Sequence, residues 1–410
     1  MKSEYDVIVV GAGPAGSVAA KTVASAGFSV LLIEKRQEIG VSIRCAEGTS
    51  KTELLKFIDL NDEDAPDFIC AELHKATVHA PDGTHFSITT KMSGIDGESG
   101  VILDRKIFDR HLAMLAGKAG ADVYTKTAAI ELIIETDGAV SGVKVSRLGN
   151  VFDVRSKIVI GADGVESLVA RWFGLSESLR LKDIETGFQY LLWDETIDQT
   201  QCQVYLGEQV APGGYVWVFP KGNNTANVGI GLLGSKTKED DGRSVDFLDR
   251  FVQKEFPNAK IIGTAFGAVP VSGGLEKIAG NGVMIAGDAA GHSDPITGAG
   301  IRNAMYAGQM AGETAIRALA AGDFSERFLS SYQSEWEKTI GKGLRRNFKI
   351  KEAYATWTDD EINAIAKIAA GLPLEDFELK EAMIAVLKSD KKLLWKLRSV
   401  YADLIKSVLF

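Results

Sequence analysis

Three glycines stand at the spacing with which a backbone wraps around phosphate groups, in Gly11-Ala-Gly13-Pro-Ala-Gly16. They follow the apolar run YDVIVV and open the helical pattern PAGSVAAKTVASAG, so we expect a strand, a tight turn and a helix. Gly11 would permit the turn, Gly13 the approach of a pyrophosphate, and Gly16 the close packing of helix on strand. Glu34 ends the next strand, FSVLLIEK, where it can accept hydrogen bonds from a ribose. The pattern predicts a dinucleotide site; a glycine-rich turn without a ligand is the alternative.

A second group of glycines lies far along the chain, in VMIAGDAAGHSDPITGAGI. Asp288 follows a strand there and is placed to bind a polyol hydroxyl. Gly298 and Gly300 precede a helix whose amides can face an anionic flavin edge. A nicotinamide dinucleotide has no need of such a distant element, whereas FAD has a ribityl chain and an isoalloxazine ring to hold. The turn IGADGVES adds Asp163 and Gly164, and FAD is therefore the predicted cofactor.

Aromatic residues alternate with valines in PGGYVWVFP, which contains Tyr215, Trp217 and Phe219. In a strand, alternate side chains share a face, so the three rings would line one side of a sheet. Two interpretations stay open from the pattern alone. The rings are either the core of a half-buried sheet or a wall for an apolar substrate.

Two further side chains can take part in proton chemistry. Cys45 lies in IRCAEG, between Arg44 and Glu47, and is either a small buried residue or a reactive thiol in a charged loop. Arg44 would orient this loop or a phosphate, or else pair with Glu47. His292 is either a proton donor or a loop histidine held by hydrogen bonds.

Composition, charge and cysteine content exclude several classes of protein. The chain has 410 residues, of which 45% are hydrophobic and 25% charged, and a net charge of -9, which argues against nucleic acid as a partner. Its cysteines, Cys45, Cys70 and Cys202, form no C-x-x-C pair, so we predict no metal site and a reducing compartment. The N-terminal residues do not resemble a signal peptide, and no apolar stretch reaches about 18 residues. A cytoplasmic protein is expected.

The remaining pattern places these motifs on an α/β fold (α+β overall). A helix is predicted over 104–121, then strands with turns at Asp137-Gly138 and Gly149-Asn150. Alternating segments fill 172–265, and the charged run 235–244 reads as a loop before a helix. We expect a Rossmann-type FAD-binding domain, a β-sheet substrate domain and a C-terminal helical region. Their predicted residues are 1–70, 99–171 and 264–323 for the first, 71–98 and 172–263 for the second, and 324–410 for the third.

The three nucleotide segments, together with Arg105 in LDRKIFDRHL, resemble the FAD-dependent para-hydroxybenzoate hydroxylase-like family over most of residues 1–320. The segments IRCAEG, PGGYVWVFP and DPITGAGI look more specifically like the archaeal geranylgeranyl reductase (digeranylgeranylglycerophospholipid reductase) family, over nearly the whole length. That resemblance implies a reductase that saturates prenyl double bonds of membrane lipids with a hydride from N5 of reduced FAD. One departure is Ala299, where a third glycine is expected, and it would shift the flavin loop slightly.

The resemblance also implies roles for residues. In the family, the aromatic segment lines the lipid cavity and the cysteine loop lies beside the flavin. The catalytic candidates are Cys45, Tyr215, Trp217 and His292. The substrate-binding candidates are Tyr215, Trp217, Phe219 and Pro295. The cofactor-binding candidates are Gly11, Gly13, Ala15, Gly16, Glu34, Lys35, Arg44, Cys45, Arg105, Asp163, Gly164, Gly287, Asp288, Gly298, Gly300 and Ile301.

Saturation of an isolated alkene needs a hydride and a proton on neighbouring carbons. Protonation toward a tertiary carbocation is plausible chemistry, and the faces of Tyr215 and Trp217 would stabilise that cation. The expected substrate is a geranylgeranyl glycerol (phospho)lipid. No second nucleotide fingerprint is present, so ferredoxin, reduced quinone and NAD(P)H stay open as electron donors.

The C-terminal segment 388–410 has apolar residues at helical spacing among lysines. Such a basic amphipathic helix lies on an anionic membrane surface or packs on the protein itself. Peripheral contact with the inner face of the cell membrane follows from the first interpretation.

Two other functions compete with the reductase. A flavin monooxygenase or halogenase has the same fold, but a halogenase would carry Trp-x-Trp-x-Ile-Pro where this chain has Tyr215-Val-Trp217-Val-Phe219-Pro220. A non-catalytic prenyl-binding escort protein need not keep FAD. The intact glycines and the acidic residues Glu34, Asp163 and Asp288 argue against the escort.

Overall fold

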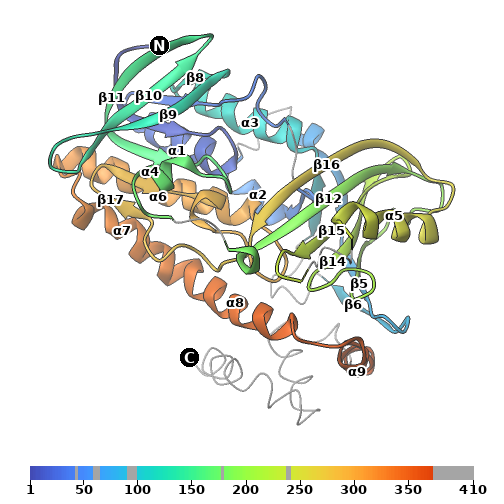
Figure 1. Ribbon diagram of the computed structural model, residues 1–410. Coiled ribbons are helices and arrows are strands. Elements are labelled where there is room, and N and C mark those ends of the chain that lie inside the picture. The colour runs from blue at the N-terminus through green and yellow to red at the C-terminus, as the bar shows by residue number, and fades with distance from the viewer. Residues whose placement is uncertain (42–44, 59–64, 90–98, 177–179, 237–241, 373–410) are drawn as a thin grey trace. The chain divides into compact units, whose positions relative to one another are not determined.

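The computed structural model describes residues 1–41, 45–58, 65–89, 99–176, 180–236 and 242–372. The chain forms two compact units, each assembled from three segments (Figure 1). The first unit consists of Met1–Ile43, Arg105–Leu179 and Pro270–Arg345. The second unit consists of Arg44–Asp104, Arg180–Val269 and Arg346–Phe410.

The first unit is built on an eight-stranded sheet whose centre is parallel. The strand β2 is apolar and buried along its length, and β1 is so from Val7 to Val10, as expected for parallel strands covered on both faces. The strands of the main path are, in spatial order, β17 (Ala279–Gly280), β18 (Val283–Ile285), β11 (Asn150–Gly161), β1 (Glu4–Val10), β2 (Val30–Ile33) and β8 (Asp122–Tyr124). The strands β9 (Thr127–Ile134) and β10 (Val140–Arg147) join β11 in an antiparallel meander (Figure 1).

Small residues let the helices of the first unit approach one another closely. A Cβ built at Gly308 would lie only 2.1 Å from the carbonyl oxygen of Ala15, and one at Gly312 would lie 2.8 Å from Cβ of Thr22. The helix α1 (Pro14–Ser25) therefore packs closely against α6 (Ile301–Ala321), and it also packs against α3 (Arg105–Lys118). The other helical segments assigned to this unit are α4 (Leu168–Trp172), η4 (Gly287–Ala290), α7 (Glu326–Trp336) and the π-helical turn η5 (Glu337–Gly341).

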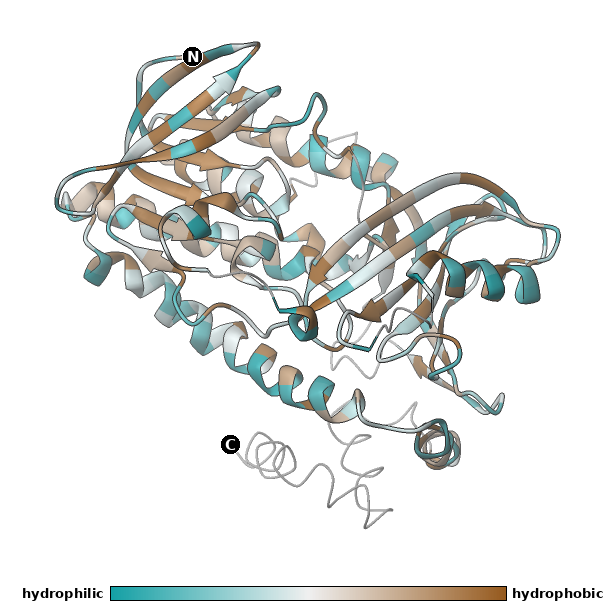
Figure 2. Ribbon diagram, in the orientation of Figure 1, coloured by the Kyte–Doolittle hydropathy of each residue, from teal (hydrophilic) through white to brown (hydrophobic). Residues whose placement is uncertain are grey.

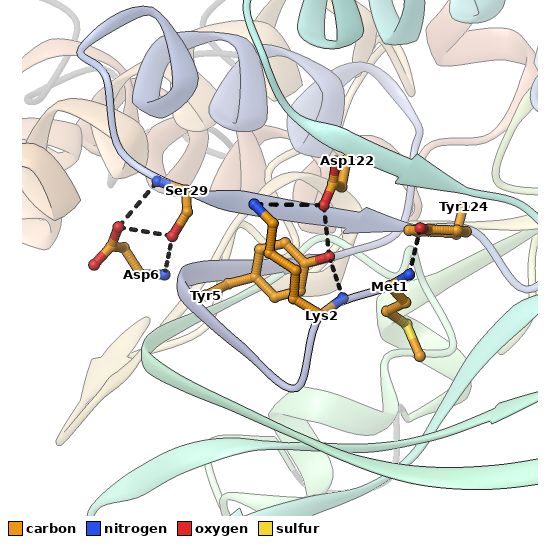
Figure 3. A network of polar contacts seen from close by, with 7 residues as sticks. All are labelled: Met1, Lys2, Tyr5, Asp6, Ser29, Asp122 and Tyr124. Atoms are coloured by element: carbon orange, nitrogen blue, oxygen red, sulfur yellow. Dashed lines mark hydrogen bonds and ion pairs between the residues drawn. The ribbon is translucent and has the colours of Figure 1, made fainter.

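A polar network fastens the beginning of β1 to its neighbours (Figure 3). The buried Tyr5 donates a hydrogen bond from its hydroxyl to Asp122 at 2.7 Å and accepts one from the amide of Lys2 at 3.0 Å. The carboxylate of Asp6 accepts hydrogen bonds from the amide and the hydroxyl of Ser29. Burial, followed by the hydrogen bond to Asp122, raises the pKa of Tyr5, so its hydroxyl stays a donor.

The second unit contains a seven-stranded sheet and a three-stranded sheet. The larger sheet has, in spatial order, β16 (Lys260–Pro270), β12 (Ile184–Trp193), β15 (Thr225–Leu233), β14 (Tyr215–Gly222), β13 (Cys202–Tyr205), β5 (Lys75–His79) and β6 (His85–Thr89). The smaller sheet has β3 (Gly48–Ser50), β7 (Gly100–Leu103) and β4 (Ile69–Leu73). The remaining helices of the described residues are α2 (Lys51–Leu55), η1 (Ala65–Phe68), η3 (Leu181–Asp183), α5 (Ser244–Glu255), α8 (Lys342–Tyr354) and α9 (Asp359–Ala370).

One face of the seven-stranded sheet forms an apolar core with α5. Val216 and Val218 of β14 pack in this core with Leu248 and Phe251 of the helix. The helices α7 and α8 alternate hydrophilic and hydrophobic residues along their length, as expected for helices with one packed face (Figure 2). None of the described helices is long and apolar enough to cross a membrane.

The predicted fold class is confirmed, and the predicted elements that fall on described residues are present. The compact units divide the chain differently from the predicted domains. Residues 45–58 cluster with the second unit, because β3 pairs with β7, which also pairs with β4. The predicted domains were defined by their expected roles in binding the cofactor and the substrate, and their boundaries stay a prediction. The amphipathic segment 388–410 lies outside the described residues.

We expect Gly308→Ala to lower the free energy of unfolding by about 1–3 kcal/mol, because the new methyl group overlaps the backbone of α1. Gly343→Ala is the matched control, since a Cβ at this position of α8 meets nothing within 4 Å. The control should raise stability by about 0.5–1 kcal/mol. Urea denaturation of both variants checks the prediction, and equal stabilities would contradict it.

Candidate functional site

The first unit brings the glycine-rich turn into the geometry that a dinucleotide requires. Gly11 has a left-handed φ of +102°, and a Cβ there would lie 2.3 Å from the carbonyl oxygen of Ala162. A Cβ at Gly16 would lie 1.9 Å from the carbonyl oxygen of Gly11. A Cβ built at Gly13 would meet no atom within 4 Å, so the backbone of Gly13 is accessible. The turn therefore leaves the amides at the beginning of α1 available to an anion.

Glu34 stands beside this turn. Its Oε2 accepts a hydrogen bond from the amide of Ala12 at 3.3 Å, and its Oε1 accepts one from the amide of Arg36 at 2.9 Å. Carboxylate oxygens have further lone pairs, so a ribose hydroxyl can still donate to them. Lys35 lies at the surface, with Nζ 3.8 Å from Glu166.

The distant aspartate segment lies against the beginning of α1, as the sequence predicts. Gly287 has a φ of +69°, and a Cβ there would lie 3.0 Å from Cβ of Ala15. Asp288 follows in η4, and a Cβ at Gly300 would lie 3.2 Å from its Oδ1. Burial raises the pKa of Asp288, while the positive charge of Arg105 acts in the opposite direction.

The loop before α6 holds its own shape. Oδ1 of Asp294 accepts hydrogen bonds from the amides of Ile296 and Thr297, and Gly298 has a φ of +67°. Pro295 is buried in this loop. Ala299 has no positive φ, so its side chain fits the backbone without strain, and Gly300 precedes Ile301 as the N-cap of α6.

Arg105 and Asp163 are held by partners within the first unit. Arg105 donates two hydrogen bonds of 2.8 Å to Asp109, one turn along α3. Asp163 accepts a hydrogen bond from Ser167 at 2.6 Å and from the amide of Leu168 at 2.7 Å, so it caps α4. Gly164 has a φ of +83° in the same turn.

His292 is buried in the core of the first unit. Its ring stacks on Trp336 with centroids 3.8 Å apart, and Asn303 donates a hydrogen bond to its backbone oxygen. Neither ring nitrogen has a hydrogen-bond partner among the described residues. Burial lowers the pKa of His292 to about 3, so the imidazole is neutral.

In the second unit, the three aromatic residues lie on the sheet face opposite α5. Tyr215, Trp217 and Phe219 pair across the sheet with Gly231, Gly229 and Asn227 of β15. We call Tyr215, Trp217 and Phe219 the aromatic face. Because the intervening valines belong to the core under α5, the aromatic face is no part of that core.

Trp217 is fixed in place on this face. Its indole lies over Gly229, where a Cβ would come within 2.3 Å of Cζ2. Its Nε1 donates a hydrogen bond of 3.0 Å to Oε1 of Gln189, and its ring meets Tyr215 edge to face at 5.9 Å. The glycine and the glutamine thus determine the orientation of the ring.

The cysteine loop lies at the phenylalanine end of the aromatic face. A Cβ at Gly48 would lie 3.3 Å from Cε2 of Phe219, and Asn227 donates a hydrogen bond to the backbone oxygen of Ala46 at 3.3 Å. The amide of Glu47 donates to Sγ of Cys45 at 3.2 Å. Two segments that are about 170 residues apart in sequence therefore meet, within the second unit. Arg44 lies outside the described residues.

Sequence reasoning missed several residues that hold these groups. Asp109, at position i+4 from Arg105 on a helix, could have been found from its spacing. Gln189 and Asn227 carried no local signal, because their partners lie on other strands. Glu47 was noted only as a neighbour of Cys45, and Lys221 was not noted at all.

The residues of the first unit fit a dinucleotide with a polyol chain. The carboxylate of Asp288 accepts no hydrogen bond from any residue that the structure describes, and it is therefore available to hydroxyl groups. The amides of α1 and the open backbone at Gly13 complete the donor set. No cluster of three or more His, Cys, Asp or Glu side chains suited to a metal ion occurs among the described residues.

Comparisons with protein families and with other proteins agree with FAD as the cofactor. The chain matches the family model "FAD dependent oxidoreductase" over residues 6–171 and the model "Geranylgeranyl reductase catalytic domain" over residues 183–269. The digeranylgeranylglycerophospholipid reductase of Methanosarcina acetivorans is 48% identical over 410 residues, which cover 100% of this chain and 99% of the relative. Digeranylgeranylglycerophospholipid reductase 2 of Methanococcoides burtonii is 50% identical over 406 residues, covering 99% and 98%.

Solved structures extend the comparison. A geranylgeranyl bacteriochlorophyll reductase-like protein from Thermoplasma acidophilum has a TM-score of 0.90 and 35% identity, with 97% of this chain and 99% of that chain covered. A flavin-dependent brominase has a TM-score of 0.71 at 19% identity, with 98% and 100% covered. At that identity the brominase shows a shared fold alone.

Replacing Asp288 by alanine should weaken FAD binding about tenfold or more, because a hydrogen-bond acceptor for a polyol hydroxyl is lost. Asp153→Ala is the matched control, since Asp153 is exposed on β11 of the same unit. Titration of the flavin-free proteins with FAD, followed by flavin fluorescence, measures both affinities. Equal affinities for the two variants would contradict the assignment of Asp288.

His292 should make the protein less stable as the pH falls. Between about pH 6.5 and 3 the unfolded chain binds a proton on this histidine that the folded chain does not. The contribution of the neutral His292 to the free energy of unfolding is complete above about pH 6.5. Below that pH it decreases by up to about 1.4 kcal/mol per pH unit. His292→Phe keeps the stack on Trp336 and should lose this slope, as urea denaturation at pH 5, 6 and 7 would show. Parallel profiles for the two proteins would count against the buried neutral imidazole.

Proposed function

We propose that this chain, which belongs to the family of digeranylgeranylglycerophospholipid reductases and is a flavin-dependent oxidoreductase, saturates the geranylgeranyl chains of archaeal membrane lipid precursors. The observation that carries the proposal is the aromatic face, which lies in the matched catalytic segment and outside the core under α5. A row of rings on a sheet suits a long apolar chain that has no polar groups to hydrogen-bond.

The cofactor is FAD, and the first unit supplies the groups to hold it. The turn at Gly11 and Gly13 and the amides of α1 would bind the pyrophosphate, Glu34 a ribose, and Asp288 the ribityl chain. When bound and reduced, FAD supplies a hydride equivalent.

The aromatic face has a second role in this proposal. A proton added to an isolated trisubstituted alkene leaves positive charge on the tertiary carbon. The negative faces of Trp217 and Tyr215 attract a cation more strongly when water is excluded. The hydrogen bond from Trp217 to Gln189 keeps the indole in one orientation, so no rearrangement is needed when charge develops.

Cys45 is our candidate for the group that delivers the proton. Gly48, just after its loop, lies against Phe219, and Cys45 is half-buried. The two other cysteines suit this role less well, because burial raises the pKa of Cys70 and raises that of Cys202 to about 12. His292 has a structural role in our proposal, since its stacked ring is enclosed by the core.

The electron donor belongs to the same proposal. Ferredoxin, reduced quinone and NAD(P)H are the three candidate classes, and anaerobic reduction of the bound flavin by each in turn identifies the one that works. We further propose a cytoplasmic protein that contacts the inner face of the membrane through its basic segment 388–410. Cosedimentation with anionic vesicles, compared with a variant in which the lysines of this segment are replaced by glutamine, tests that contact.

The central experiment is anaerobic. The flavin-loaded protein is reduced with dithionite, mixed with geranylgeranyl glycerol lipids, and the products are analysed by mass spectrometry. Successive gains of two hydrogens support the reductase. If the lipid is unchanged while the flavin stays reduced, the reductase is overturned. If the flavin is reoxidised only when oxygen and an aromatic substrate are added together, a monooxygenase is favoured. Purified protein that binds lipid but no flavin would favour an escort.

Trp217→Leu should slow turnover of bound lipid about tenfold or more, because the best cation-stabilising ring is lost. Trp217→Phe should lose less, since a smaller ring remains on Gly229. Trp193→Leu is the control, because Trp193 is exposed at the end of β12 in the same sheet. Single-turnover reduction of bound lipid separates this effect from lipid affinity. Equal rates for Trp217→Leu and the control would rule out the aromatic role.

A further inference from the structure

A buried ion pair ties the cysteine loop to the seven-stranded sheet. Oε2 of Glu47 lies 2.5 Å from Nζ of Lys221 and 2.6 Å from Nδ2 of Asn227. The side chain of Glu47 is 2% exposed and that of Lys221 12% exposed. Two charges removed from water in this way give little net stability, so such a pair is often retained for the one arrangement that it specifies.

The loop is also fixed through its backbone. Glu47 has a left-handed φ of +72°, which is unfavourable for a residue with a side chain. Its carbonyl oxygen accepts a hydrogen bond from Leu103 of β7 at 3.0 Å. In this conformation its amide points at Sγ of Cys45, 3.2 Å away. The conformation that the ion pair maintains is therefore the one that directs a donor at the sulfur.

We propose that Glu47, Lys221 and Asn227 form an anchor that positions the Cys45 thiol at the phenylalanine end of the aromatic face. The three residues are positioning residues, and the inference rests on the proposed function for the role of Cys45 in proton delivery. Lys221 and Glu47 neutralise each other, so this ion pair brings no net charge to the apolar surface. Asn227 serves both the carboxylate of Glu47 and the backbone of Ala46, and so couples the loop to β15.

The test separates loop position from stability. In Glu47→Ala/Lys221→Met both charges and the carboxylate acceptor are removed together, which avoids leaving one charge buried alone. The matched control is Glu72→Gln/Lys51→Met, which removes a partly exposed ion pair of the same unit. Each flavin-loaded protein is treated with iodoacetamide, and alkylation of each cysteine is followed by mass spectrometry. Cys202 serves as the internal reference, because burial raises its thiol pKa to about 12.

We expect Cys45 to be alkylated at least fivefold faster in the anchor variant and at an unchanged rate in the control. The rate of reduction of bound lipid should fall about tenfold, while lipid affinity stays within twofold. Alkylation of Cys45 within twofold of the unmodified protein overturns the anchor. A fivefold faster alkylation with an unchanged rate of lipid reduction overturns the positioning role, because the anchor would then serve stability alone.

A second variant covers the case in which the double variant fails to fold. Glu47→Gly/Lys221→Met again removes both charges, and glycine adopts a left-handed φ without strain at position 47. The same gain in alkylation is expected from it, and its absence would overturn the anchor. If the unmodified protein reduces no lipid, the proposed function fails, and the alkylation rates alone then decide whether the anchor holds Cys45.

Discussion

Backbone contacts at the first turn of α1 are the constraint on which the first unit depends. The carbonyl oxygen of Gly11 approaches the Cα of Gly16. The carbonyl oxygen of Ala15 likewise approaches the Cα of Gly308. Neither position tolerates a Cβ, so glycine at position 16 lets α1 begin directly against the turn, and glycine at position 308 lets α6 pack close to α1. Gly287 meets Ala15 at the same turn, and Asp288 is thereby held beside the beginning of α1. Close packing at this turn thus brings together both halves of the candidate nucleotide site.

The second unit depends on the alternation of side chains between the two faces of β14, whereas the first unit depends on close backbone packing. Along β14, valines complete the apolar core under α5 while the intervening rings form the aromatic face. Gln189, Asn227 and Glu47 are polar and buried, yet each has a hydrogen-bond partner. Because unsatisfied polar groups are costly in such surroundings, these bonds give the rings and the cysteine loop defined positions.

The sequence predicts more of the first unit than of the second. The turn at Gly11 and the strand before Asp288 carry local signals, because the spacing of glycines and apolar residues reflects backbone geometry. The rings of β14 were predicted to share a face, but the sequence could not decide between core and substrate wall. The structure shows that α5 covers the valine face, and the role of the rings as a substrate wall stays a proposal. The anchor of Glu47 was beyond prediction, since it joins residues about 170 positions apart through side chains alone. His292 was judged by its residue type, and its burial against Trp336 depends on tertiary packing.

The alternation along β14 also limits how this chain can change in evolution. Insertion or deletion of a single residue within Tyr215–Gly222 would exchange the two faces, moving rings under α5 and valines onto the opposite surface. Both functions of the strand would be lost in one step. Length changes can therefore survive only in steps of two residues or where a bulge absorbs the extra one, as the irregular pairing between Pro220 and Gly222 already does. Point substitutions can change the rings one at a time, so the aromatic face can vary by substitution and not by changes in length.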